Sequence, residues 1–196
     1  MAKEDFYIEK IDKGSAKSIL NTYHYLKDIS KGFKSGYNYG LFLKNKVLVG
    51  TCIYTGFPVP ELAKGCYGLD RHEQEGLFEL SRLCLVPEVQ KKEHNLASWF
   101  VSRSLLMLKC ETKVRAILSY ADSEFHEGII YKACNFKYYG LSDLKKDFWF
   151  KLEDGSYTKH TRGTVKGKEG EWRPRSQKHR YLMTCDKKLT CRWKQI

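Results

Sequence analysis

The sequence has no long hydrophobic run, and this absence limits where the protein can reside. A membrane-spanning helix needs roughly 20 consecutive apolar residues, and no stretch of the 196 residues approaches that length. The amino-terminal segment MAKEDFYIEK also lacks the apolar core of a signal peptide. We therefore expect a protein with no membrane segment, located in the cytoplasm.

Paired cysteine motifs are absent as well. The seven cysteines are scattered, their number is odd, and none forms a C-x-x-C pair. This pattern favours buried thiols in a reducing compartment over disulfides. A zinc site needs clustered ligands, and neither Cys66 with His72 nor Cys185 with Cys191 supplies enough of them. We predict no metal site.

Charge, by contrast, is abundant and uneven. The formal net charge is +12 and the sequence pI is about 9.3. Residues 1–150 contain 22 Lys and Arg against 18 Asp and Glu, a net of +4, whereas residues 151–196 contain 13 against 5, a net of +8. Aromatic residues are interleaved with these cations, as in surfaces that bind phosphates and stack on bases. The basic end therefore favours a nucleic-acid partner, DNA or RNA, over a merely solvated tail.

Hydrophobic periodicity predicts an α/β (α+β) fold with a mixed sheet. We expect strands at 5–11, within 37–55, at 78–86, 114–122, 136–140 and 147–152, and helices at 14–26, 94–111 and 123–135. Residues 57–76 are predicted to be an irregular excursion and residues 163–176 a basic loop, with SYTKHTRGTV and HRYLMT as a basic hairpin. We predict one domain over residues 1–150 and a basic extension, residues 151–196, packed on it.

The segment FELSRLCLVPE, residues 78–88, reads as a strand with polar side chains in its middle. Strict alternation places Phe78, Leu80 and Arg82 on one face and Glu79, Ser81 and Leu83 on the other. A β-bulge would change that division. Because a buried unpaired charge costs several kcal/mol, roughly, the strand is expected either to border an open cleft or to hold a structural Glu79–Arg82 pair.

The order of elements resembles the GNAT acyltransferase superfamily, in which the fourth and fifth strands splay apart. The segment at 78–88 stands at the fourth strand, and YKACNF, from Tyr131, is similar to the family's Y-x-x-x-G-F with Asn135 in place of glycine. The resemblance implies a central mixed, mostly antiparallel sheet, flanked by helices. It also implies that a donor's pantetheine arm lies in the split.

A narrower resemblance is to the phage Mom DNA-modification family. It rests on ELSRL (79–83), NLASWFVSRSL (95–105), SYAD (119–122), GIIYKACNFKYYG (128–140), H-x-R (160–162) and KHRYL (178–182). The resemblance implies modification of the exocyclic N6 amine of adenine in double-stranded DNA, with a carbamoylmethyl-type product. That product protects phage DNA from host restriction, so a phage-encoded protein would work in the host cytoplasm.

Five residues are candidates for catalysis. Asp122 ends a buried strand, and ligands gather at strand ends in open α/β sheets. Its carboxylate could accept an N–H of the adenine amine, which is a poor nucleophile. Alternatively, Asp122 caps the following helix. The resemblance to GNAT enzymes implies that Tyr131 protonates a leaving group; alternatively, it simply packs its helix on the sheet. Ser81 and Arg82 are expected to line the cleft, and His24 is a base, a substrate contact or a structural histidine.

The expected donor site lies on the same split. Leu83 and Leu85 belong to its strand, and Lys91, Lys92 and Asn95 occupy the region where GNAT enzymes bind the pyrophosphate of coenzyme A. The glycines of that phosphate-binding turn are missing here. This absence argues against coenzyme A, so acetyl-coenzyme A or another acyl donor is only one candidate, and the sequence does not identify the cofactor.

Nucleic-acid contact is expected from aromatic and basic side chains together. A base must leave the duplex to reach such a cleft, at a cost of a few kcal/mol, roughly, that stacking recovers. The predicted contacts are Tyr37, Tyr39, His160, Arg162, Lys178, His179 and Arg180.

Three functions are consistent with these patterns. The first is a phage-type DNA-modification transferase that acts on adenine. The second is an acetyl-coenzyme A-dependent N-acetyltransferase acting on a protein or small amine, which predicts tight coenzyme A binding. The third is a non-catalytic nucleic-acid-binding module, which predicts salt-dependent DNA binding and no altered nucleoside.

Overall fold

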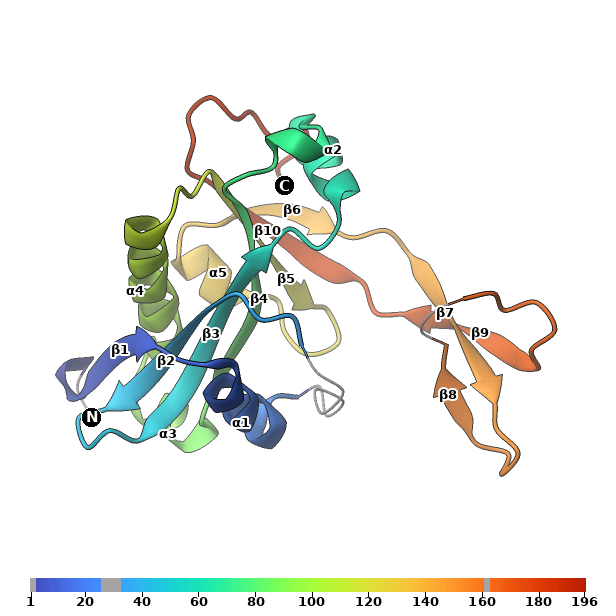
Figure 1. Ribbon diagram of the computed structural model, residues 1–196, viewed down its shortest axis with the longest axis horizontal. Coiled ribbons are helices and arrows are strands. Elements are labelled where there is room, and N and C mark those ends of the chain that lie inside the picture. The colour runs from blue at the N-terminus through green and yellow to red at the C-terminus, as the bar shows by residue number, and fades with distance from the viewer. Residues whose placement is uncertain (1–2, 26–32, 161–162) are drawn as a thin grey trace.

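The computed structural model describes residues 3–25, 33–160 and 163–196 (Figure 1). The helices are α1 (Lys13–Tyr23), α2 (Pro60–Tyr67), α3 (Pro87–Lys92), α4 (Leu96–Glu111) and α5 (Ile129–Ala133), with 3-10 turns at Lys3–Asp5 and Arg71–Glu73. The strands are β1 (Phe6–Lys10), β2 (Tyr37–Leu43), β3 (Leu48–Gly56), β4 (Leu77–Leu85), β5 (Ala116–Asp122), β6 (Lys137–Leu141), β7 (Lys145–Lys151), β8 (Tyr157–Lys159), β9 (Gly170–Arg175) and β10 (Lys178–Thr184).

A seven-stranded sheet forms the centre of the molecule, in the order β1-β2-β3-β4-β5-β10-β6. Every neighbouring pair is antiparallel except β4 and β5, which are parallel. Parallel neighbours need a crossover connection, and here α3 and α4 supply it. The predicted mixed, mostly antiparallel sheet is confirmed.

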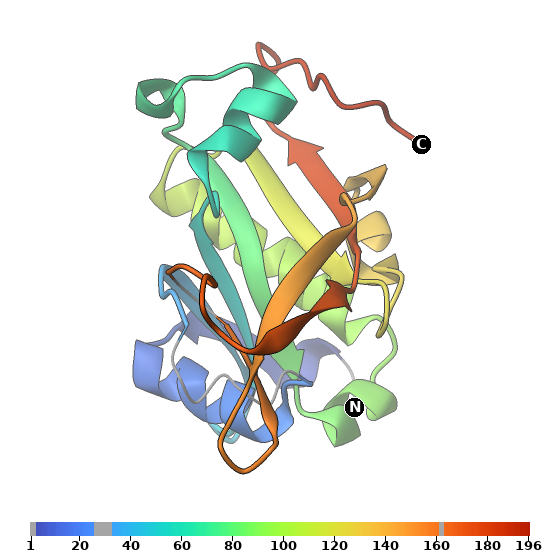
Figure 2. The same ribbon diagram turned by 90° about the vertical axis from the view of Figure 1, so that its right-hand side faces the viewer.

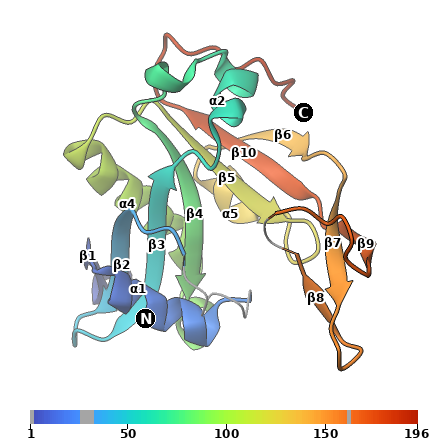
Figure 3. The same ribbon diagram turned by 45° about the vertical axis from the view of Figure 1, so that its right-hand side comes forward.

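The parallel pair is incomplete. Residues 77–80 of β4 pair with 116–119 of β5, and the pairing ends at Leu80 and Ser119. Beyond that point the carboxyl ends of the two strands lie apart (Figure 3). The predicted splay of the fourth and fifth strands is therefore present, and it leaves backbone of both strands without a partner strand at the split.

A β-bulge lies in β4 at the same level. Ile53 of β3 pairs with Arg82 and the next residue, Tyr54, pairs with Leu80, so that Ser81 is an extra residue in β4. The bulge shifts the alternation by one position. Arg82 therefore lies on the same face as Glu79, and Leu83 lies on the opposite face, contrary to strict alternation.

Helices cover both faces of the sheet. On one face α4 and α5 pack over the main hydrophobic core, in which Phe100, Val101 and Leu108 of α4 are fully buried. On the other face α1 packs through Ile19 and Leu20, and α2 packs through Ala63 and Cys66. The carboxyl-terminal segment runs beside α2 (Figure 2), where Trp193 packs against the α2 cluster.

Local signals account for the ends of α1 and α2. The Asp12 side chain accepts hydrogen bonds from the amides of Gly14 and Ser15 and so caps α1. Pro60 occupies the first turn of α2 and Gly68, at φ 74°, ends it. Residues 57–76, predicted to be irregular, therefore contain a helix and a 3-10 turn.

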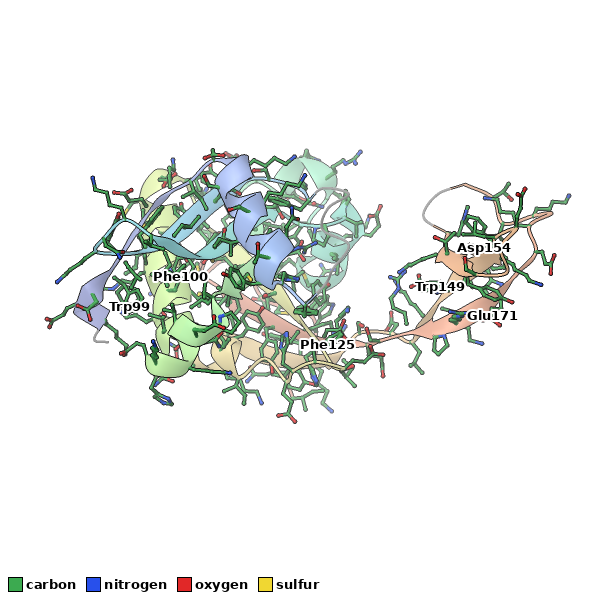
Figure 4. All side chains as sticks on the ribbon, turned by 90° about the horizontal axis from the view of Figure 1, so that it is seen from below. Trp99, Phe100, Phe125, Trp149, Asp154 and Glu171 are labelled. Carbon is green, nitrogen blue, oxygen red and sulfur yellow. The ribbon has the colours of Figure 1, made fainter. Side chains whose placement is uncertain are left out.

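The basic end of the chain divides between two sheets. β10 inserts between β5 and β6 of the main sheet, so HRYLMT does not form the expected hairpin with SYTKHTRGTV. β7, β8 and β9 form a separate three-stranded sheet, residues 145–175, which we call the arm. Figures 1 and 4 show the arm projecting from the main body, with Trp149, Asp154 and Glu171 on it. The division at residue 150 stays a prediction, although the arm begins before it.

None of the helices in the described part of the chain is both long and apolar enough to cross a membrane. All seven cysteines are free thiols, and Cys52, Cys66, Cys84 and Cys134 are buried.

The position of β10 leads to a test of stability. Leu182 of β10 is 1% exposed in the core beneath α2, whereas Leu144, just before the arm, is 80% exposed. Leu182→Ala should lower the free energy of unfolding by about 2–5 kcal/mol because it leaves a cavity in the core. The Leu144→Ala control should change it by about 0.5 kcal/mol or less. Urea denaturation measures both, and equal small effects would contradict the placement of β10.

Candidate functional site

A polar cavity of about 340 Å³ lies where β4 and β5 part. All five residues predicted to be catalytic line it: His24 after α1, Ser81 and Arg82 of β4, Asp122 at the end of β5 and Tyr131 of α5. Other polar and aromatic side chains also line this cavity: Tyr25, Glu79, Tyr120, His126, Lys145, Arg175, Ser176 and Lys178. Segments distant in sequence therefore meet at the split.

A second, mostly apolar cavity of about 350 Å³ adjoins the first. Leu83 and Leu85, predicted to contact the donor, line it together with residues of α5 and Ala97 in the first turn of α4. Four side chains line both cavities: Tyr25, Leu83, His126 and Tyr131. The two cavities therefore meet at the split, one polar and one apolar.

The other predicted donor contacts do not line either cavity. Lys91 and Lys92 are exposed in the last turn of α3, and Asn95 is the exposed residue before α4. Asn95 has φ 58°, a left-handed conformation that glycine adopts readily and that asparagine tolerates better than most residues. The turn before α4 thus keeps a glycine-like backbone even though the glycines are missing.

Asp122 is 4% exposed and forms an ion pair with Lys178. Its other carboxylate oxygen accepts a hydrogen bond from the amide of Glu124 at 3.2 Å. Burial raises the pKa of Asp122, but hydrogen bonds from Lys178, Ser176 and the Glu124 amide outweigh burial, and the pKa is lowered overall. The carboxylate is therefore ionised at neutral pH, as an acceptor for an N–H requires.

Asp122 closes a turn but does not cap a helix. The helix predicted to begin at residue 123 begins at Ile129 instead, after Gly128 at φ 76°. A side chain at Gly128 would meet the ring of Tyr181 at 2.5 Å. Glycine at this position therefore lets α5 start close to β10 and brings Tyr131 to the split.

Tyr131 is a buried hydroxyl at the junction of the two cavities. It is 7% exposed, and its ring packs against those of Phe136 and Tyr181. Burial raises the pKa of Tyr131 to about 12, although a hydrogen bond with Ser119 opposes the shift. The hydroxyl therefore carries its proton at neutral pH and can donate it.

The bulged residues of β4 have distinct partners. Ser81 Oγ donates to the carbonyl of Ile53 at 3.2 Å, and Arg82 donates from Nη1 to the carbonyl of Ser81 at 2.6 Å. Arg82 Nε is buried, with no hydrogen-bond partner among the residues that the structure describes. Burial raises the pKa of Glu79, and the charges of Arg82 and Lys34 oppose that shift.

His24 follows α1 and stacks on Tyr25, with ring centroids 4.5 Å apart. Burial lowers the pKa of His24 to about 4, and the positive charges of Arg82 and His126 lower it further. The imidazole is therefore neutral at neutral pH and can accept a proton or a hydrogen bond.

Lys178, His179 and Arg180 were predicted to contact nucleic acid, but all three have partners within the protein. Lys178 lies in the polar cavity against Asp122. His179 Nδ1 lies 2.9 Å from the hydroxyl of Tyr138, and Arg180 donates to the carbonyl of Tyr139 at 2.8 Å. Lys178 thus belongs to the candidate catalytic site.

Tyr39 corrects the prediction of base stacking. It is 0% exposed in the main core and donates its hydroxyl hydrogen bond to Glu111 at 3.0 Å, so it offers no face to a base. Tyr37 packs edge-on against Phe78, with centroids 5.6 Å apart. His160 lies on the arm against Phe148 and Phe150, and Arg162 falls outside the described residues.

Sequence reasoning missed several cavity residues. Tyr25 and His126 come from segments without regular structure, and Lys145, Arg175 and Ser176 come from the base of the arm. No local pattern marks them; only the register of Lys178 with Asp122 brings the base of the arm to the split. Among the described residues, no group of three or more His, Cys, Asp or Glu could hold a metal ion.

Two solved acetyltransferases and a condensation domain share this fold. A Bacillus subtilis acetyltransferase in complex with CoA aligns with a TM-score of 0.53 and 13% identity over 91% of this chain and 98% of that one. The Escherichia coli ribosomal-protein-S18-alanine N-acetyltransferase aligns with a TM-score of 0.53 and 11% identity, over 92% of this chain and 94% of that one. The carboxyl-terminal condensation domain of Ebony, in complex with beta-alanyl-dopamine, aligns with a TM-score of 0.54 and 10% identity, over 91% of this chain and 98% of that one.

The sequence itself matches one family. The profile of the Mom protein family matches residues 5–195, nearly the whole chain. No curated protein matches the sequence significantly.

The lowered pKa of His24 leads to a test by NMR. We expect its imidazole to titrate near pH 4, because burial and the neighbouring cations disfavour the charged form. The pKa of histidine in an unfolded chain is about 6.5. At pH values between about 4 and about 6.5, the unfolded state therefore binds more protons than the folded state. Stability should therefore fall as the pH is lowered from about 6.5 to 4.

The His24→Gln variant provides the control for that titration. It should lose the resonance that titrates near pH 4 and part of the pH dependence of the unfolding free energy. A His24 midpoint at or above 6.5 would contradict the buried environment described for this side chain.

Proposed function

Because the chain belongs to the Mom protein family, we propose that it is a transferase that modifies the N6 amine of adenine in double-stranded DNA. Its resemblance to that family implies a carbamoylmethyl-type product and protection of the DNA from restriction. The observation that carries the proposal is the meeting of two cavities at the split, with an ionised Asp122 in the polar cavity and a protonated Tyr131 at the junction of the two.

The polar cavity suits the acceptor. A volume of about 340 Å³ is within the range of small-molecule pockets, and an adenine extruded from the duplex would enter it. Tyr25 and Tyr120 line the cavity and offer aromatic surface to a base, while Asp122 offers an acceptor to the exocyclic amine. The ion pair with Lys178 holds this carboxylate in place.

The apolar cavity suits the donor. Leu83 and Leu85 of the parted strand line it, and so does Ala97 at the amino end of α4. An extended donor molecule, acyl or related, could lie along the free edge of β4 there, with an anionic group toward the amino terminus of α4. Lys91, Lys92 and Asn95 precede this helix and could add charge and hydrogen bonds to such a group.

The transfer step follows from these positions. The N6 nitrogen attacks the electrophilic carbon of the donor, the bond from that carbon to the leaving group breaks, and a nitrogen–carbon bond forms. Asp122 accepts the N–H of the amine and then its proton, which makes the delocalised nitrogen a better nucleophile. Tyr131 gives its proton to the leaving group. Arg82 and His24 position the reactants from the polar side.

Asp122 provides the first test. Plasmid DNA from cells that express the protein should resist restriction enzymes whose sites contain adenine. Asp122→Asn should restore full cleavage, because an amide cannot take the proton of the amine. Asp143→Asn, which changes a second carboxylate at the same cavity, should leave the plasmid resistant. Resistance that survives Asp122→Asn in a folded protein would remove Asp122 from the mechanism.

Tyr131 provides the second test. Tyr131→Phe keeps the ring and its packing but removes the proton donor, so the rate at which modified deoxyadenosine accumulates should fall roughly 100-fold or more. Tyr138→Phe, in a tyrosine that lines neither cavity, is the matched control and should remain near the wild-type rate. An undiminished rate in Tyr131→Phe would exclude this residue as the acid.

An acetyltransferase that acts on a protein or small amine is the competing function, because the solved relatives of this fold include acetyltransferases. Calorimetric titration with acetyl-coenzyme A separates the two. Tight binding without any change to DNA would favour the competitor, whereas altered adenine would establish the proposed reaction.

A further inference from the structure

The arm has two chemically different faces. Directly paired residues of antiparallel strands share a face, and Lys145 pairs with Arg175, Asp147 with Arg173, and Trp149 with both Lys159 and Glu171. We call this side the charged face. Its strand cations are Lys145, Lys151, Lys159, Arg173 and Arg175.

The opposite face is mainly aromatic. Phe148 pairs with Trp172 and is 8% exposed, and Phe150 pairs with Thr158. Lys146 is the one cation that the described strand positions place on this face. Lys168 lies in the loop before β9. Its ammonium group is 5.3 Å from the ring centre of Phe150, so it belongs to the aromatic face.

The charged face begins at the candidate active site. Lys145 and Arg175, its first pair, both line the polar cavity. The arm leaves the main body there, and Figure 4 shows it extending well beyond the central sheet. A polymer that delivered one residue to the cavity would therefore pass along this face.

Three of the five strand cations on the charged face are held in place. Asp147 forms ion pairs with both Arg175 and Lys159, and the Arg175 hydrogen bond lowers the pKa of Asp147 to about 2. The guanidinium of Arg173 lies 4.9 Å from the ring centre of Trp149 and 4.7 Å from that of Tyr157. Fixed guanidinium groups lose little side-chain entropy when they bind a phosphate.

We propose that the charged face of the arm binds the sugar-phosphate backbone of the DNA duplex that flanks the target adenine. This inference rests on the proposed function, because an extruded base remains attached to its duplex and the duplex must lie at the mouth of the cavity. The arm contains nine Lys and Arg against five Asp and Glu, a net charge of +4, which complements a polyanion.

Lys145 and Lys146 supply a matched comparison, since they are adjacent in β7 and point to opposite faces. Lys145→Gln/Arg173→Gln removes two charges from the charged face, and Lys146→Gln/Lys168→Gln removes two from the aromatic face. Each variant would be titrated with a short fluorescein-labelled duplex over a series of salt concentrations. Thermal unfolding would establish that each remains folded.

The two double variants should behave differently. Each phosphate contact contributes about 0.9 to the slope of log K against log[salt], so the charged-face variant should lose about 2 from that slope. The aromatic-face variant should keep the wild-type slope. Equal losses in both variants, or a loss only in the second, would overturn the assignment of the charged face.

The same titration separates this inference from the proposed function. Wild-type protein that does not bind the duplex would contradict both. Wild-type protein that binds DNA and produces modified adenine, with an unchanged slope in Lys145→Gln/Arg173→Gln, would overturn only the role of the arm.

Discussion

The parting of β4 and β5 is the constraint on which the rest of the structure depends. Two parallel strands that stay paired along their length would leave no room between them, and a sheet covered by helices on both faces would be a closed core. Here the pairing stops at Leu80 and Ser119. The bulge at Ser81 then turns Arg82 toward the polar cavity and places Leu83, on the opposite face of β4, where the two cavities meet. One break in a hydrogen-bond ladder thus creates two adjoining sites of opposite character.

The ion pair between Asp122 and Lys178 connects that split to the basic end of the chain. β10 lies between β5 and β6, and its register sets Lys178 opposite Asp122. An unpaired buried carboxylate would be costly, so the lysine both stabilises Asp122 and keeps it ionised. Because Lys178 follows the arm by only a few residues, the same register fixes where the arm leaves the main body. The proposed catalytic site and the proposed polyanion-binding face are therefore joined through one strand.

Much of the fold could be predicted from the sequence because its signals are local. Alternation in FELSRLCLV and the apolar spacing in α4 predicted the strand and the helix, and the resemblance of the element order to the GNAT superfamily implied the sheet and its splay. The five candidate catalytic residues line the polar cavity, and four of them stand in quoted motifs or at a strand end, whereas His24 follows the first helix. The partners of β10 could not be predicted, since a strand pattern does not show which neighbours it will pair with. The prediction that Tyr39 stacks on a base was wrong for a related reason. Its surroundings depend on α4, since its hydroxyl bonds to Glu111, 72 residues later.

The central claim is that this cleft alters adenine in DNA, and the mass of the nucleosides tests it most directly. DNA from a bacterium that expresses the chain would be digested and its nucleosides analysed by mass spectrometry. The account predicts a new deoxyadenosine species, heavier by the transferred group and substituted at N6, beside unchanged deoxycytidine, deoxyguanosine and thymidine. Unmodified deoxyadenosine in cells that contain the folded protein would contradict it.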